Sequence, residues 1–167
     1  MKRLPLAILL LCSTLALSAQ SRGARYQGEI LTGYGVSNKK SDRIYLHTLH
    51  GCRFGEHFFA GIGAGATAMV AYLDVDVGFG DKVMGTLFTN FKGYVPIDQK
   101  TNLFASLDAG LVFDGGPMYS LSVGLNLKKA RNNALNLSLG HEAMSWSGYT
   151  PNALNERAVV FKIGYQF

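Results

Sequence analysis

The sequence lacks the long apolar run that a helical membrane span requires. Beyond the first 19 residues, no uninterrupted apolar stretch reaches about 18 residues. Charge is also scarce, because Asp, Glu, Lys and Arg make up only 16% of the 167 residues, against roughly 25% in soluble domains. Hydrophobic residues nevertheless make up 48% of the chain, which excludes a disordered protein. The length predicts one domain.

The N-terminus has the pattern of a cleaved secretory signal. Residues 1–3 are Met-Lys-Arg, residues 6–17 are largely apolar, and small residues follow up to Ala19. We therefore predict cleavage after Ala19 during export through the inner membrane. Residues 1–19 would be the signal, and residues 20–167 would form the mature domain.

Cysteine is also scarce. Cys12 lies inside the expected signal, so Cys52 is alone in the mature domain and no internal disulfide is possible. A lipid anchor on Cys12 is disfavoured, because the bulky Leu11 precedes it. The fold must therefore be held by hydrogen bonds and packing.

Basic residues are in slight excess. Without the signal, the net charge of about +3 is too small to indicate nucleic-acid binding. Two basic clusters lie between apolar segments, where we expect solvated turns or, as an alternative, contact with anionic lipid headgroups. The clusters are Lys39, Lys40 and Arg43, and Lys128, Lys129 and Arg131.

In much of the mature sequence, apolar and polar residues alternate with a period of two. Leu135, Leu137 and Leu139, for example, are separated by Asn, Ser and Gly, which is typical of a strand with one apolar and one polar face. Each of eight such segments reaches the roughly 9–11 residues that a tilted transmembrane strand needs. The predicted strands are residues 25–36, 42–54, 57–72, 83–95, 102–113, 117–128, 133–145 and 156–167.

The polar face of these strands carries mostly Gly, Ser, Asn and Ala, which fit the narrow interior of an eight-stranded barrel. A soluble barrel would instead show many long charged side chains on that face. The polar face of this sequence carries few charged residues, with equal numbers of acids and bases. Charges enclosed inside a barrel must be paired. We predict a paired interior network rather than the alternative of scattered surface charges. Its members are Glu29, Arg53, Lys92, Asp108, Glu142 and Lys162, with Glu29 near Arg53, Lys92 near Asp108, and Lys162 near Glu142 and Glu29.

Aromatic residues gather at both ends of the predicted strands, as in the aromatic girdles of transmembrane barrels. Exceptions occur at Phe59, Phe88, Phe104 and Met118, which fall on the predicted interior face. One band holds Tyr26, Phe54, Phe58, Tyr165 and Phe167, and the other holds Tyr34, Tyr72, Phe113, Tyr119 and Trp146.

The last nine residues, 159–167, alternate apolar and polar residues and end in Phe. This ending resembles the C-terminal signature of outer-membrane barrels. The mature chain resembles the small OmpA/OmpX-like outer-membrane β-barrel proteins of the porin-like superfamily, and residues 103–110 and 134–140 share in the likeness. The resemblance implies an all-β, eight-stranded antiparallel up-and-down transmembrane β-barrel in a Gram-negative outer membrane. It also implies insertion by the barrel-assembly machinery, with Phe161, Ile163, Tyr165 and Phe167 as the assembly signal.

The resemblance does not imply one activity, because such barrels include adhesins, structural proteins, narrow pores and enzymes. We expect a structural or surface-interaction role with a largely filled interior. The alternatives are a narrow channel for small solutes and a lipid-modifying enzyme. The expected surroundings are outer-membrane lipid and lipopolysaccharide, and we expect a monomer with no cofactor and no nucleic-acid partner.

Neither a metal site nor a catalytic residue is predicted. Of His47, His50 and Cys52, only the last two share a face of a strand, which is too few ligands for a metal. His141 and Ser145 share the predicted outer face, but Glu142 points the other way. Glu156 lies on the next predicted strand and its orientation stays open, so the sequence does not establish the carboxylate that a catalytic triad needs.

Overall fold

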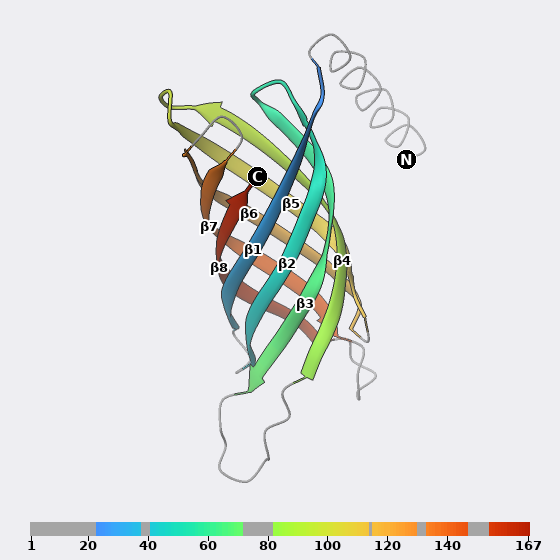
Figure 1. Ribbon diagram of the computed structural model, residues 1–167. Coiled ribbons are helices and arrows are strands. Elements are labelled where there is room, and N and C mark those ends of the chain that lie inside the picture. The colour runs from blue at the N-terminus through green and yellow to red at the C-terminus, as the bar shows by residue number, and fades with distance from the viewer. Residues whose placement is uncertain (1–22, 38–40, 72–81, 114, 130–132, 147–153) are drawn as a thin grey trace, which may run out of the picture.

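In the computed structural model, eight antiparallel strands close into one barrel, in which each strand pairs with the next and β8 pairs with β1 (Figure 1). The structure describes residues 23–37, 41–71, 82–113, 115–129, 133–146 and 154–167, so the predicted signal lies outside it. Within these ranges no helix is long and apolar enough to cross a membrane. The strands are β1 (Arg25–Ser37), β2 (Ser41–Phe54), β3 (Phe58–Ala71), β4 (Lys82–Pro96), β5 (Thr101–Val112), β6 (Pro117–Lys128), β7 (Ala134–Trp146) and β8 (Leu154–Gln166).

The alternating sequence accounts for these strands, and the predicted fold class is confirmed. Each observed strand lies within two residues of its predicted bounds. Burial follows the same period, because β6 alternates between exposed apolar and buried polar residues: Leu121 is 61% exposed, whereas Ser122 is 4% exposed. The apolar residues of the pattern therefore face outward and the polar ones face the barrel interior.

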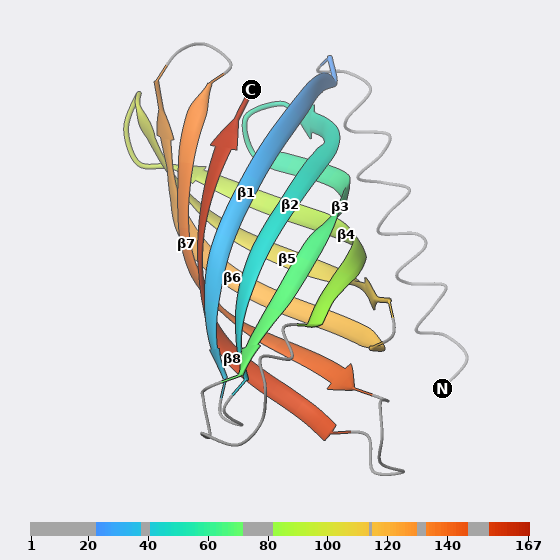
Figure 2. The ribbon, with the colours of Figure 1, turned by 60° about the horizontal axis from the view of Figure 1, so that its bottom comes forward.

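The two ends of the barrel differ. Both described termini lie at the end that also carries the connections β2–β3, β4–β5 and β6–β7 (Figures 1 and 2). The β2–β3 turn is tight, and Gly55 adopts a positive φ of 62° there, which glycine tolerates best. We call this end the termini end. The connections at residues 72–81 and 147–153 belong to the opposite end.

Apolar side chains fill part of the interior in three clusters. The first consists of Leu49, Phe59, Phe88, Tyr94 and Phe104, the second of Met69, Met84, Val112, Met118 and Met144, and the third of Tyr45, Ala158 and Val160. The inward placement of Phe59, Phe88, Phe104 and Met118 is thus confirmed.

Glycine makes room for these rings. A Cβ atom on Gly63 would lie 2.2 Å from the Phe88 ring, and one on Gly61 would lie 2.7 Å from the Phe59 ring. The Gly-rich face of β3 therefore faces inward, and the missing Cβ atoms let aromatic rings approach the strand closely inside a narrow barrel.

Candidate functional site

The interior holds five of the six residues predicted for the charge network. These five residues are buried, and they are Glu29, Lys92, Asp108, Glu142 and Lys162. The sixth, Arg53, is half-buried near the termini end.

Two lysines reach across the lumen to carboxylates on distant strands. Lys92 Nζ on β4 forms an ion pair with Glu29 Oε2 on β1. Lys162 Nζ on β8 lies 2.9 Å from Asp108 Oδ2 on β5 and donates to Ser120 Oγ at 3.1 Å. The Asn90 amide also donates to Asp108, so this carboxylate has two donors. Both buried cations are thus neutralised by a buried acid.

A third network surrounds Arg43, which lies on β2 and is fully buried. Its Nη1 donates to Glu142 Oε1 at 2.8 Å and its Nη2 to Glu156 Oε2 at 2.9 Å. The Tyr45 hydroxyl donates to the same Glu142 oxygen at 2.8 Å. The expectation of a solvated turn at Arg43 was wrong. Arg43 has the same parity on β2 as Arg53, and this alternation is the sequence signal that places it inside.

Two of the predicted pairings inside the network were wrong, whereas Lys92 and Asp108 line the same small cavity, as expected. Glu29 pairs with Lys92 rather than with Arg53, and Lys162 pairs with Asp108 rather than with Glu142. The prediction assumed that partners lie on neighbouring strands. An eight-stranded barrel is so narrow that long side chains from opposite walls meet at its axis. The ion pairs therefore join β1 to β4, β5 to β8, and β2 to both β7 and β8.

Little free volume remains around the two lysine pairs. The cavity lined by Glu29, Lys92, Asp108 and Lys162 has a volume of about 20 Å³, enough for about one water molecule. The middle of the barrel is therefore closed by paired charges and packed side chains.

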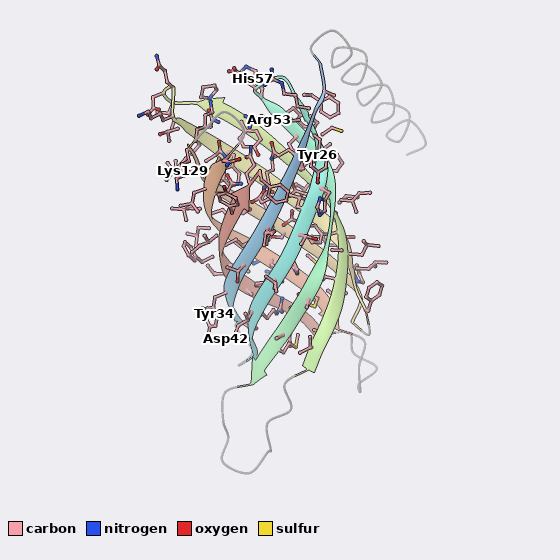
Figure 3. The ribbon with its side chains drawn as sticks, in the orientation of Figure 1. Tyr26, Tyr34, Asp42, Arg53, His57 and Lys129 are labelled. Atoms are coloured by element: carbon pink, nitrogen blue, oxygen red, sulfur yellow. The ribbon has the colours of Figure 1, made fainter. Side chains whose placement is uncertain are left out.

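The termini end, in contrast, opens into a cavity of about 580 Å³, which we call the mouth. In Figure 3, Arg53 and Lys129 lie at this end, and Tyr34 and Asp42 lie at the opposite end. The mouth is lined by residues from β1, β2, β6 and β8, from the turns after β2 and β4, and from the positions directly after β6 and β8. They are Arg25, Tyr26, Gln27, Arg53, Gly55, Glu56, Gln99, Lys100, Lys128, Lys129, Gln166 and Phe167.

Arg53 is fixed in this mouth by two contacts. Its guanidinium carbon lies 4.3 Å from the centroid of the Tyr94 ring, a cation–π contact. Its Nη2 donates to the Glu56 carbonyl oxygen at 2.8 Å. The sequence alone did not reveal the mouth, because its residues come from separate segments that meet only when the barrel closes.

The turn at residues 97–100 positions Lys100 beside the mouth. The backbone N–H groups of Lys100 and Thr101 each donate to Asp98 Oδ1 at 2.7 Å. These hydrogen bonds hold the pKa of the Asp98 carboxyl below its ordinary value, and the one from Lys100 contributes most.

The candidate metal and catalytic groups lie apart. His47 is buried next to Thr67 and Thr86, whereas His50 and Cys52 are exposed on the outer face of β2. His50 Nδ1 is hydrogen-bonded to the Tyr26 hydroxyl at 2.6 Å. Among the described residues no cluster of three metal-ligating side chains occurs.

On β7, His141 is exposed on the outer face, whereas Glu142 points inward to Arg43. Glu156 on β8 also contacts Arg43. The carboxylates of Glu142 and Glu156, the two acids considered as partners for His141, are thus bound to Arg43 instead. The side chain of Ser145 is not among those that the structure describes.

The two aromatic bands are visible where their side chains are described. Tyr26, Tyr165 and Phe167 are exposed near the termini end, and Tyr34, Phe113 and Tyr119 are exposed toward the other end. Phe54 and Phe58 are half-buried. Tyr72 and the Trp146 side chain lie outside the described part of the chain.

No protein-family model and no curated protein matches this sequence. Solved structures do match its fold. Neisserial surface protein A is 11% identical with a TM-score of 0.54, and the alignment covers 87% of this chain and 98% of that one. The outer membrane enzyme PagL is 11% identical with a TM-score of 0.52, covering 81% and 97%. A designed transmembrane β-barrel is also 11% identical with a TM-score of 0.52, covering 84% and 95%.

Proposed function

Because the chain has the fold of the small eight-stranded outer-membrane barrels, we propose that it is an integral outer-membrane protein with a structural or surface-interaction role. Its interior is filled, so the barrel acts as a rigid membrane-embedded support rather than as a channel or a catalyst. Outer-membrane lipid and lipopolysaccharide surround it, and it acts as a monomer.

The observation that carries this proposal is the apolar outer surface. Large apolar side chains are exposed on the outer faces of the strands, including Leu46 at 61%, Ile62 at 61% and Leu121 at 61%. Water would make such a surface costly, since soluble monomers rarely expose a contiguous apolar patch beyond a few hundred Å². A bilayer makes it favourable. Closure also leaves no unpaired strand edge, as the hydrocarbon core demands.

The filled interior favours a non-conducting role over the channel alternative. Two ion pairs span the lumen, and the cavity that Lys92 and Lys162 line has a volume of only about 20 Å³. An ion or solute would have to break these pairs to pass.

The connections favour an orientation with the termini end in the periplasm. Outer-membrane barrels have short periplasmic turns and longer extracellular loops. The turns at residues 55–57 and 97–100 are short, and the connection at residues 72–81 belongs to the opposite end. A surface interaction would therefore involve the end opposite the termini.

The membrane location is tested by cell fractionation and by gel mobility. We expect the protein in the outer-membrane fraction, with its N-terminus at Gln20, and we expect the folded form to migrate faster before boiling than after it. A water-soluble periplasmic protein with identical mobility in both lanes would contradict the proposal.

The closed interior is tested by conductance across a planar lipid bilayer. Wild-type protein should give no stable current steps. The double variant Glu29→Ala/Lys92→Ala is the matched control, because it removes one ion pair that spans the lumen and should raise conductance. Stable steps from the wild type at the same level as the variant would favour the channel alternative.

A further inference from the structure

The mouth is strongly and unevenly charged. Among its lining residues five side chains are cationic and one, Glu56, is a carboxylate. None of the ion pairs found among the described residues involves any of the five cations. The five are Arg25, Arg53, Lys100, Lys128 and Lys129.

The fold also brings like charges together in this mouth. Arg25 on β1 and Arg53 on β2 are direct cross-strand partners, and like charges in that position destabilise a sheet. The Lys128 backbone N–H donates to the Lys100 carbonyl at 2.7 Å, which brings two lysines next to each other. An anion between such pairs would relieve their repulsion.

One of the cationic groups, the Arg53 guanidinium, is held in place before any ligand arrives. Arg53 rests on the Tyr94 ring and donates to the Glu56 carbonyl. Tyr94 in turn accepts a hydrogen bond from Gln27 Nε2 at 3.4 Å. A site that is ordered in advance loses less side-chain entropy on binding.

The lining also includes an unused buried polar atom. Gln27 lines the mouth and is 3% exposed, and its Oε1 has no hydrogen-bond partner among the described residues. A buried acceptor without a partner is costly. A ligand hydroxyl or a protonated phosphate oxygen could donate to it.

We propose that the mouth binds one multivalent phosphorylated anion from the aqueous compartment at the termini end. The cations come from four separate segments around the rim, so a ligand with several negative groups can contact more of them than a monovalent one. The volume of about 580 Å³ lies within the range of roughly 300–1,000 Å³ typical of ligand pockets. Phosphate groups suit Arg and Lys, because their oxygens accept several charge-assisted hydrogen bonds.

The position of the cations favours an aqueous ligand over a lipid headgroup. Arg25 and Arg53 share the inward face of β1 and β2, whereas Tyr26, the residue after Arg25, faces outward. A lipid headgroup would have to leave the bilayer surface and cross the rim to reach them. This inference goes beyond the role proposed above and requires only the folded barrel.

The test uses isothermal titration calorimetry with sodium tripolyphosphate on the mature chain folded in zwitterionic nanodiscs. We expect one anion per barrel and an affinity that falls as NaCl is raised, because salt screens the charges. Arg53→Gln should weaken binding about tenfold or more, since it removes a preorganised charged donor. The double variant Lys128→Gln/Lys129→Gln should do the same and leaves the Arg53 contacts intact.

Arg157→Gln is the matched control for Arg53→Gln. Arg157 is exposed on β8 and pairs in register with Ala143, outside the mouth. The Arg157→Gln substitution removes the same charge as Arg53→Gln but should leave the affinity for tripolyphosphate within about twofold of the wild-type value. Equal weakening in all variants, or no saturable binding to the wild type, would overturn the proposal.

A second arm tests the lipid source by native mass spectrometry of protein released from phosphatidylglycerol micelles. The proposal expects equal lipid retention by the wild type and Arg53→Gln. Phosphatidylglycerol retained through Arg53, together with no tripolyphosphate binding, would assign the mouth to a membrane headgroup and overturn the aqueous ligand.

Discussion

The cations inside the barrel and those at its mouth are treated differently by the fold. Each interior cation contacts a carboxylate, as Arg43, Lys92 and Lys162 show. The five mouth cations take part in none of the described ion pairs. Burial explains the difference, because a charge removed from water needs a partner, whereas water screens an exposed one. The interior charges thus serve the barrel itself, and the mouth charges stay available to a ligand.

The largest effect is expected from the most buried cation. Arg43→Met leaves Glu142 buried without its cation, and breaking a buried pair in this way costs about 3–5 kcal/mol. Adding Glu142→Gln should recover part of that loss, since it removes the stranded charge. The measurement is reversible urea unfolding in lipid vesicles for the two variants and the wild type. A neutral Arg43→Met would mean that Arg43 is hydrated like a mouth residue.

A smaller loss is expected at Lys162, which lies beside the small interior cavity and Ser120. Lys162→Met should lower the free energy of unfolding by about 2–3 kcal/mol, because Asp108 loses a charged donor. Asp108→Asn should rescue part of this loss. Glu142→Gln should not rescue it, since Glu142 contacts Arg43 instead. Rescue by Glu142→Gln would restore the pairing that the sequence suggested.

Replacing a lysine of the mouth with methionine should have almost no effect on the free energy of unfolding. Lys129 is exposed, so Lys129→Met should change the free energy of unfolding by less than about 0.5 kcal/mol. The comparison with Lys162→Met in the same urea titration removes differences in side-chain chemistry. A loss at Lys129 equal to that at Lys162 would break the distinction between the two regions.

The smallest effect concerns pH at the edge of the mouth. Backbone N–H groups hold the pKa of Asp98 below its ordinary value of 3.8. The contribution of this carboxylate to turn stability is therefore present above the unfolded pKa and lost as pH falls through the lower, folded pKa. NMR titration in micelles should show the Lys100 and Thr101 amide signals shifting only below the ordinary Asp range. The shifts should vanish in Asp98→Asn, and a midpoint at or above 3.8 would contradict the turn geometry.

Alternation was enough to predict the strands and the direction of their faces. The pattern of Leu135, Leu137 and Leu139 defines which side chains face outward, and the sides of Phe59 and Phe88 follow from the same parity. Sequence order could not predict which charges meet, because contacts across the lumen depend on strand tilt and barrel width. Arg43 was missed for a different reason: its closeness to Lys39 and Lys40 resembled a basic turn.

The mouth was harder still to predict. Its cations lie at positions 25, 53, 100, 128 and 129, and no short segment of the sequence shows their convergence. They come together only because every second connection of an up-and-down barrel lies at the same end. The cleavage site after Ala19 and the role of the C-terminal residues in assembly stay predictions, to be tested by N-terminal sequencing and by deletion of Phe167.

The ion pairs that cross the lumen bear on how the barrel forms. Their partners are 63, 54 and 99 residues apart in the chain, for Lys92–Glu29, Lys162–Asp108 and Arg43–Glu142 respectively. Contacts of such high sequence separation are made late and slow down folding. A single hairpin cannot form them, and the Arg43–Glu142 pair crosses the seam between β1 and β8, so these two charges stay hydrated until the seam closes. Neutralisation of Arg43 and closure of the last strand seam are therefore coupled, and a half-closed barrel would keep water around this arginine.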